Sequence, residues 1–121
     1  MIDAVGRVIV YVNNPKVTGD FWINNFDFMK LSESKDMVEL LPREGADTAI
    51  VFFNRVMVEK MNPEMNLGVP SILFSCKSFD QTYMDLKGKG VLVGEIVEMN
   101  GTRTFNFADN NHNYFAIREI E

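Results

Sequence analysis

Few residues of this chain could take part in chemistry. The 121 residues include one histidine, His112, and one cysteine, Cys76. His112 lies in the polar stretch Asp109-Asn-Asn-His-Asn113, where a solvated turn residue with a left-handed backbone is favoured over a general base. Cys76 alternates with Ser75 in a β-like stretch, which indicates a buried, inert thiol. With no Ser-His-Asp set or phosphate loop in the sequence, we assign no catalytic residue.

Arg7 is the most informative charged residue, because it lies in the apolar stretch VGRVIVYV at 5–12. A buried guanidinium without a partner costs a large free energy. Two explanations therefore stay open. Arg7 forms a structural ion pair with Glu95, or it holds a ligand carboxylate or phosphate through a bidentate pair.

Composition limits the classes of function. Hydrophobic content of 46% and charged content of 24% are typical of a soluble globular domain. The net charge of −5 disfavours nucleic acid and anionic membranes as partners, and mildly favours neutral or cationic ligands. The single cysteine fits a reducing compartment, and no signal peptide or membrane span is apparent, so we expect a cytoplasmic protein.

The hydrophobic pattern predicts the elements that position these residues. Asn14-Pro15 starts a helix that carries Val17, Phe21, Trp22 and Phe26 and ends near Asp27. A capping-box pattern, Ser78-Phe-Asp-Gln81, starts a second helix that Gly88 and Gly90 end. The turn at Asn100-Gly101 predicts a type I′ hairpin. The predicted strands are 5–12, 28–31, 37–41, 48–54, 69–76, 91–99, 102–107 and 114–117.

The two halves of the chain follow the same order, β-α-β-β-β. Four pairs of landmarks share one and the same spacing along the chain: Val5 and Val69, Asn14 and Ser78, Phe28 and Leu92, and Phe53 and Ile117. Repetition at one spacing indicates an internal repeat. We therefore expect an α+β fold in one domain over 1–121. Module one covers about 1–55, a Met-rich connection with one helical turn covers 56–68, and module two covers 69–121.

This arrangement resembles the vicinal oxygen chelate superfamily, also named the glyoxalase/bleomycin resistance/dioxygenase superfamily. Asp20-Phe-Trp-Ile-Asn-Asn-Phe-Asp-Phe28 is similar to its helix-to-strand segment, and Gly101-Thr-Arg-Thr-Phe-Asn-Phe-Ala-Asp109 is similar to its penultimate strand. Asp109-Asn-Asn-His-Asn113 stands where the family usually has Asp-Pro-Asp-Gly-Asn. The resemblance implies two βαβββ modules that form a curved mixed sheet, and a homodimer.

Enzymes of the family hold a divalent metal on inward residues of the first and last strand of each half. The resemblance places these positions at Arg7, Phe52, Ser71 and Ala116. None of these side chains is a good metal ligand. A shift of one residue gives Gly6, Phe53, Pro70 and Ile117, which is no better. We therefore predict that the protein has no metal cofactor.

Strand alternation predicts which residues share the face on which the family binds its ligands. The predicted hairpin register pairs Glu98 with Arg103, Ile96 with Phe105 and Glu95 with Asn106. The predicted ligand-binding residues mix apolar walls with a few polar groups, as small-molecule pockets do. They are Arg7, Ile9, Tyr11, Phe52, Ser71, Leu73, Glu95, Thr104, Asn106, Tyr114 and Ala116.

Three functions follow. The first is a metal-free protein that binds or sequesters a small molecule, similar to the antibiotic-binding members of the family. The second is a glyoxalase- or dioxygenase-type enzyme whose metal ligands would come from Glu33, Glu39, Glu95 and His112. The third is a dimeric scaffold without a ligand.

Overall fold

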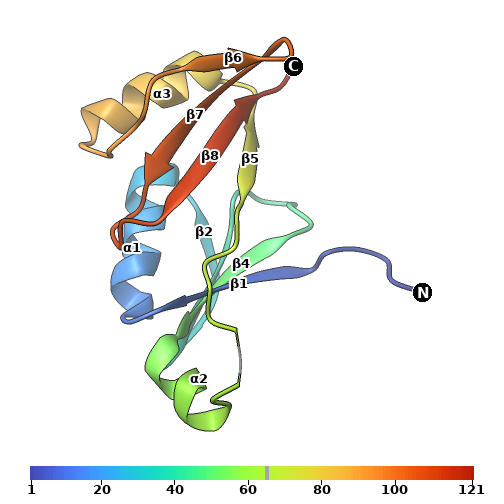
Figure 1. The fold of residues 1–121 in the computed structure, drawn as a ribbon, viewed down its shortest axis with the longest axis vertical. Helices are drawn as coiled ribbons and strands as arrows, with labels where there is room; N and C mark the ends of the chain where they lie inside the picture. The colour runs from blue at the N-terminus through green and yellow to red at the C-terminus, as the bar shows by residue number, and fades with distance from the viewer. Residues whose placement is uncertain (65) are drawn as a thin grey trace. The chain divides into compact units, whose positions relative to one another are not determined.

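The computed structural model describes residues 1–64 and 66–121. The chain forms two compact units, Met1–Pro70 and Ser71–Glu121. Each unit contains a four-stranded mixed sheet and a helix that follows its first strand (Figure 1). The predicted α+β fold with two βαβββ modules is confirmed. None of the described helices is long and apolar enough to cross a membrane.

Module one follows the predicted order of elements. In its sheet, β1 lies beside β4 and parallel to it, and the pairs β4–β3 and β3–β2 are antiparallel. Its elements are β1 (Arg7–Val12), α1 (Pro15–Phe26), β2 (Met29–Ser34), β3 (Met37–Leu41) and β4 (Ala49–Asn54). A further helix, α2 (Arg55–Met61), follows β4, so the connection holds more helix than the single turn expected from its weak periodicity.

The ends of α1 follow from local chemistry. The Asn14 side chain accepts a hydrogen bond from the Val17 amide at 3.2 Å, which satisfies a donor that the first turn leaves free. Asp27 ends the helix in the left-handed conformation, with φ of 58°. Both helix ends therefore lie where the sequence predicted them.

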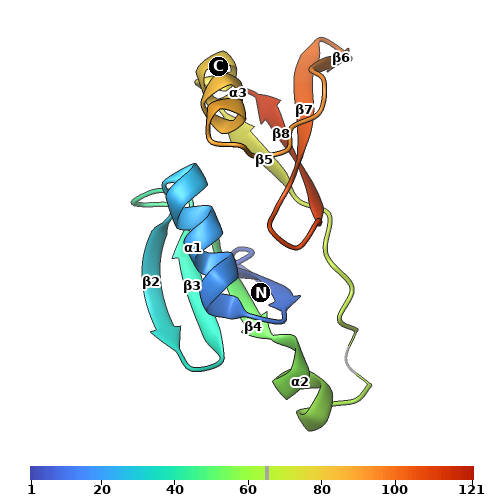
Figure 2. The same ribbon diagram turned by 90° about the vertical axis from the view of Figure 1, so that its left-hand side faces the viewer.

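The face of α1 that packs on the sheet includes only some of the large apolar residues that the helix carries. Trp22 is buried and contacts the Phe52 ring, but Val17 is exposed. Thr18 and Gly19 are buried in its place. A β-carbon at Gly19 would lie 2.9 Å from the Val38 side chain. The helix thus approaches the sheet (Figure 2) more closely than a side chain at this position would allow.

Module two repeats the arrangement, and its first two strands, β5 and β6, are shorter than predicted. Its sheet has the order β5-β8-β7-β6, and β5 is parallel to β8. The start of α3 is where the sequence predicted it, although the Ser78 side chain makes no capping hydrogen bond. The elements are β5 (Leu73–Cys76), α3 (Phe79–Gly88), β6 (Val97–Met99), β7 (Thr102–Ala108) and β8 (Tyr114–Glu119).

The predicted hairpin between β6 and β7 is confirmed at its turn, but its strand register differs from the prediction before β6. Asn100 and Gly101 both have positive φ, 53° and 79°, as a type I′ turn requires. Glu98 pairs with Arg103 as predicted. Beyond β6, the Gly94 amide donates to the Asn106 carbonyl and Val93 is opposite Phe107. The predicted Glu95–Asn106 pairing is therefore wrong, because the register changes by one residue before this point.

Arg103 joins α3 to the last strand of module two. Its guanidinium donates two hydrogen bonds to Asp80, at 3.0 and 2.8 Å, and two to Glu119, at 3.0 and 2.7 Å. It also lies over the Phe79 ring. These hydrogen bonds lower the pKa of both carboxyl groups from their ordinary values of 3.8 and 4.5.

This cluster predicts a dependence of stability on acid pH. Because both folded pKa values are lowered, the stabilisation is present above the ordinary values and is lost as pH falls through the folded ones. We expect the melting temperature of Arg103→Gln to fall less steeply below about pH 4.5 than that of the native chain. Parallel slopes in a thermal-melt series would contradict this role. Lys77→Gln, which removes an exposed cation from the same module, is the control.

Candidate functional site

Each sheet has one face against its helix and one face turned away from it, which we call the distal face. In module one, Val10, Phe52 and Val38 are neighbours on the helix face and are buried. Alternation then places Arg7, Ile9 and Tyr11 on the distal face. Their neighbours there, from the strand registers, are Ala49, Val51, Phe53, Met37 and Glu39.

An ion pair crosses the distal face of module one. The Arg7 Nε lies against Glu39 Oε2, and because β4 separates β1 from β3, the pair spans β4. Ser32 donates a hydrogen bond to the other Glu39 oxygen at 3.0 Å. The Arg7 Nη1 donates to the Gly6 carbonyl at 2.9 Å. Arg7 thus has the partner that the sequence required, but it is Glu39 of the same module and not Glu95.

Phe52 does not lie on the distal face, so the sheet face predicted for its side chain is wrong. Its side chain is fully buried on the helix face, with its ring 5.8 Å from Trp22. The error comes from assuming that one repeat spacing holds for all strands. Ile9 pairs with Val51, and its equivalent Leu73 pairs with Ala116. The spacing between the two last strands is therefore longer by one residue than that between the first strands, and a slip of one residue turns a side chain to the opposite face.

The corrected register changes the residues at the positions where the family holds metal. The counterpart of Ala116 in module one is Val51, which has no ligating atom. Arg7 is held by Glu39, and Ser71 is an exposed residue before β5. Over residues 1–64 and 66–121, no group of three or more His, Cys, Asp or Glu could hold a metal ion. The side chains at these positions do not fit a divalent metal.

In the described part of the chain, the residues predicted as alternative metal ligands do not form a metal-binding group. Glu33 Oε2 lies 3.3 Å from Lys30 Nζ, and Glu33 is opposite the buried Val38, which places it on the helix face. Glu39 is bound by Arg7 and Ser32. His112 has φ of 62° and is exposed, so its prediction as a left-handed turn residue is confirmed. Cys76 is half-buried, less than the sequence predicted, and its sulfur lies 3.2 Å from the Thr82 hydroxyl of α3.

Module two has a distal face of similar make-up. Leu73 lies beside Ala116, which lies opposite Asn106, and Thr104 lies opposite Arg118. The Arg118 Nε donates to the Ser75 hydroxyl at 3.1 Å. Tyr114, two residues before Ala116, is largely exposed on the same face. Of the predicted residues in this module, only Glu95 and Ser71 are not placed on this face by a strand pairing.

Several residues of the site are missing from the set that the sequence predicts. Glu39 is predicted only as an alternative metal ligand. Alternation could have placed it on the distal face, because Val38 and Leu40 beside it are buried on the other face. Val51 and Phe53 are absent because of the register error. Arg118 follows from the same alternation along β8, which was a signal for a polar group on this face.

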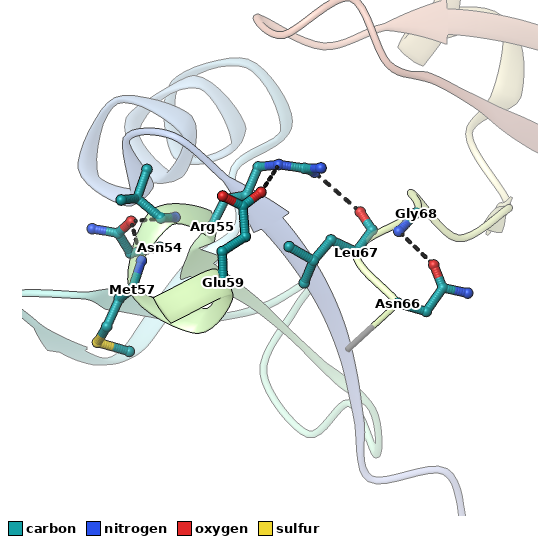
Figure 3. A network of polar contacts seen from close by, with 8 residues as sticks. Asn54, Arg55, Met57, Glu59, Asn66, Leu67 and Gly68 are labelled. Atoms are coloured by element: carbon teal, nitrogen blue, oxygen red, sulfur yellow. Dashed lines mark hydrogen bonds and ion pairs between the residues drawn. The ribbon is translucent and has the colours of Figure 1, made fainter. Parts of the chain in front are cut away.

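A shallow pocket of ≈ 670 Å³ lies in the connection. Arg55 lies 3.1 Å from Glu59 and donates to the Leu67 carbonyl at 3.2 Å, which holds the connection against α2 (Figure 3). The charged side chains of this pocket, Arg55 and Glu59, are thus paired with each other. We therefore place the candidate site on the distal faces, not here. The pocket is lined by Arg55, Glu59, Pro63, Asn66, Leu67, Gly68 and Val69.

Comparison with known proteins gives one curated relative and many similar structures. No family model matches the chain. The uncharacterized protein YetH of Bacillus subtilis is 29% identical over 125 residues, which covers 98% of this chain and 100% of YetH.

Solved structures cover nearly the whole chain. TnmS3, an antibiotic binding protein from a Streptomyces species, has a TM-score of 0.83 at 22% identity, over 99% of this chain and 98% of TnmS3. Lactoylglutathione lyase from Agrobacterium tumefaciens has a TM-score of 0.81 at 12% identity, over 98% and 94%. A glyoxalase/bleomycin resistance protein/dioxygenase superfamily member from Sphaerobacter thermophilus has 0.80 at 23% identity, over 98% of both chains.

These neighbours include a binding protein and an enzyme, so the fold alone does not decide the activity. They agree with the two βαβββ modules described above, and with the resemblance that the sequence predicted. The chain has the fold of the glyoxalase/bleomycin resistance/dioxygenase, or vicinal oxygen chelate, superfamily.

Proposed function

We propose that this protein is a member of that superfamily that binds or sequesters a small molecule without a metal. The observation that carries the proposal is the make-up of the distal faces. Each combines apolar side chains, such as Ile9 and Leu73, with a few fixed polar groups, such as Arg7 and Arg118. Such a combination is typical of small-molecule sites. The antibiotic-binding neighbour TnmS3 supports the same class of function.

The proposal includes the assembly and its location. The chain acts as one glyoxalase-like domain, 1–121, and it works as a homodimer in the cytoplasm. Its partners are then a small molecule and a second copy of the chain, with no nucleic acid and no membrane. The acidic net charge of −5 supports the exclusion of polyanionic partners.

Metal titration tests the metal-independent part of the proposal. We expect protein purified without chelator to hold less than one equivalent of metal, and its melting temperature to be unchanged by Ni²⁺, Zn²⁺ or Mn²⁺. The physical reason is that Arg7, Val51, Ser71 and Ala116 supply no metal ligands. A ligand present at about 100 times its Kd would stabilise the folded state by about 2.7 kcal/mol. Stoichiometric binding of a metal, with a comparable stabilisation and a higher melting temperature, would instead support the metal-dependent enzyme.

A panel of small molecules tests the binding function itself. Thermal-shift screening of aromatic acids, neutral aromatics and aromatic amines is expected to give at least one compound that raises the melting temperature in a saturable manner. Absence of any such compound over a broad panel would leave a scaffold as the better description.

A further inference from the structure

The charges on the distal face of module one differ from those of the chain as a whole. The protein carries a net charge of −5. On β1, β3 and β4, the distal face carries one acidic residue, Glu39, and one basic residue, Arg7. On β2, Lys30 and Glu33 lie opposite Leu40 and Val38 and belong to the helix face. The residues of this face on β1, β3 and β4 therefore do not contribute to the acidic excess of the chain.

The two charged groups of the face are not equally available. Glu39 has only 13% of its side chain exposed, and both of its oxygens have partners, Arg7 and Ser32. Arg7 has 51% of its side chain exposed. Its guanidinium has five N–H donors, of which Nε faces Glu39 and Nη1 reaches the Gly6 carbonyl. The charged atoms that this face offers to a ligand are therefore guanidinium N–H groups.

Apolar side chains continue from Arg7 along the same face. Ile9 is exposed and Tyr11 is half-buried, and Tyr11 lies beside Phe53 of β4. At about 3.3 Å per residue, Arg7 and Tyr11 are about 13 Å apart along β1. This length suits a small, partly flat molecule with one polar end.

We propose that Arg7 is the anchor for an acidic group of the ligand, and that Glu39 is the positioning residue that fixes the guanidinium. The ligand class is a carboxylic acid with an apolar or aromatic body, which lies on Ile9, Tyr11 and Phe53. The inference rests on the proposed small-molecule binding. It replaces the mild preference for cationic ligands that the net charge suggested, because local charge dominates over distant, screened charge. It also joins the two explanations of Arg7, since the ion pair leaves donors for a ligand.

Three matched probes test the ligand class: 2-naphthoate, 2-naphthamide and 2-naphthylmethylammonium, which share one ring system and differ in charge. We expect naphthoate to shift the backbone amide resonances of Ile9, Tyr11, Val51 and Phe53 in two-dimensional NMR titrations. The amide and the amine should bind at least about tenfold more weakly, because neither can accept a charge-assisted pair from Arg7. A net-acidic protein without a local cation would instead prefer the amine.

Two variants locate the preference. Arg7→Gln is expected to lower naphthoate affinity by at least about tenfold and to bring it to the level of the amide. Lys16→Gln removes the same charge from α1, on the other side of the sheet, and should leave the affinity within about twofold. The tryptophan fluorescence of Trp22 reports whether each variant is folded. Arg7→Lys is a second variant that keeps the charge, and it should retain an intermediate affinity.

The outcomes separate this inference from the proposed function. If all three probes bind with equal affinity and shift the same resonances, small-molecule binding stands and the anionic class is wrong. Tighter binding of the amine, or naphthoate binding unchanged in folded Arg7→Gln, also overturns the role of Arg7. If no probe binds, the inference fails, and the broad panel alone then decides the proposed function.

Discussion

Phe52→Ala is expected to destabilise the protein by about 3–5 kcal/mol, whereas Phe53→Ala should cost about 1 kcal/mol. The two residues are adjacent in β4 but face opposite sides of the sheet. Phe52 is fully buried against Trp22, so its removal leaves a cavity that the packed core cannot fill. Phe53 is half-buried on the distal face beside Tyr11.

Urea unfolding followed by tryptophan fluorescence measures this difference, because Trp22 is the only tryptophan and lies in module one. The ligand experiment should give the reverse order. Phe53→Ala is expected to weaken naphthoate binding, since the ring forms part of the surface for the apolar body. Equal destabilisation by both substitutions would show that the register of β4 is incorrect. Leu40→Ala, another buried residue of the helix face, is the control for a general core effect.

The pair Phe52 and Phe53 also shows how far the sequence could predict the site. Local signals identified the elements, because Asn14, Asp27 and the Asn100-Gly101 turn act through their own backbone and nearest neighbours. The internal repeat predicted that both modules share one topology. Which face each side chain occupies depends on strand register, which the repeat spacing fixed only to within one residue. A slip of one residue leaves the order of helices and strands unchanged. It turns every side chain of the strand to the opposite face, and so changes which residues belong to the site.

The partner of Arg7 depends on the same long-range information. The sequence showed that an arginine in an apolar strand needs a carboxylate, and Glu95 was the acidic residue that the predicted hairpin placed on the right face. The structure supplies Glu39, which is distant from Arg7 in the chain and lies on β3, beyond β4 in the sheet. Glu95 lies outside β6, in the segment where the register shifts. Neither fact is encoded in local propensity or in alternation alone.

The turn at Asp109 is the second place where a single substitution should have a large effect. One Asp109 oxygen accepts hydrogen bonds from the amides of Asn111 and Asn113, both at 2.9 Å, and the side chain is buried. Asp109→Ala leaves two amide donors without this acceptor. Since a hydrogen bond to a charged group contributes about 1.5–3 kcal/mol, and water can replace part of that at the partly exposed amides, we expect a total loss of about 2–4 kcal/mol.

Asp109→Asn separates the hydrogen bonds from the charge. Its side-chain oxygen can accept from the same amides, so we expect a loss below about 1 kcal/mol. Hydrogen exchange of the β8 amides is the measurement, because the turn sets the register between β7 and β8 that places Asn106 beside Ala116 on the distal face. Protection of β8 should fall in Asp109→Ala and persist in Asp109→Asn. If both variants lose protection equally, the negative charge of Asp109 stabilises the turn, and the two hydrogen bonds alone do not.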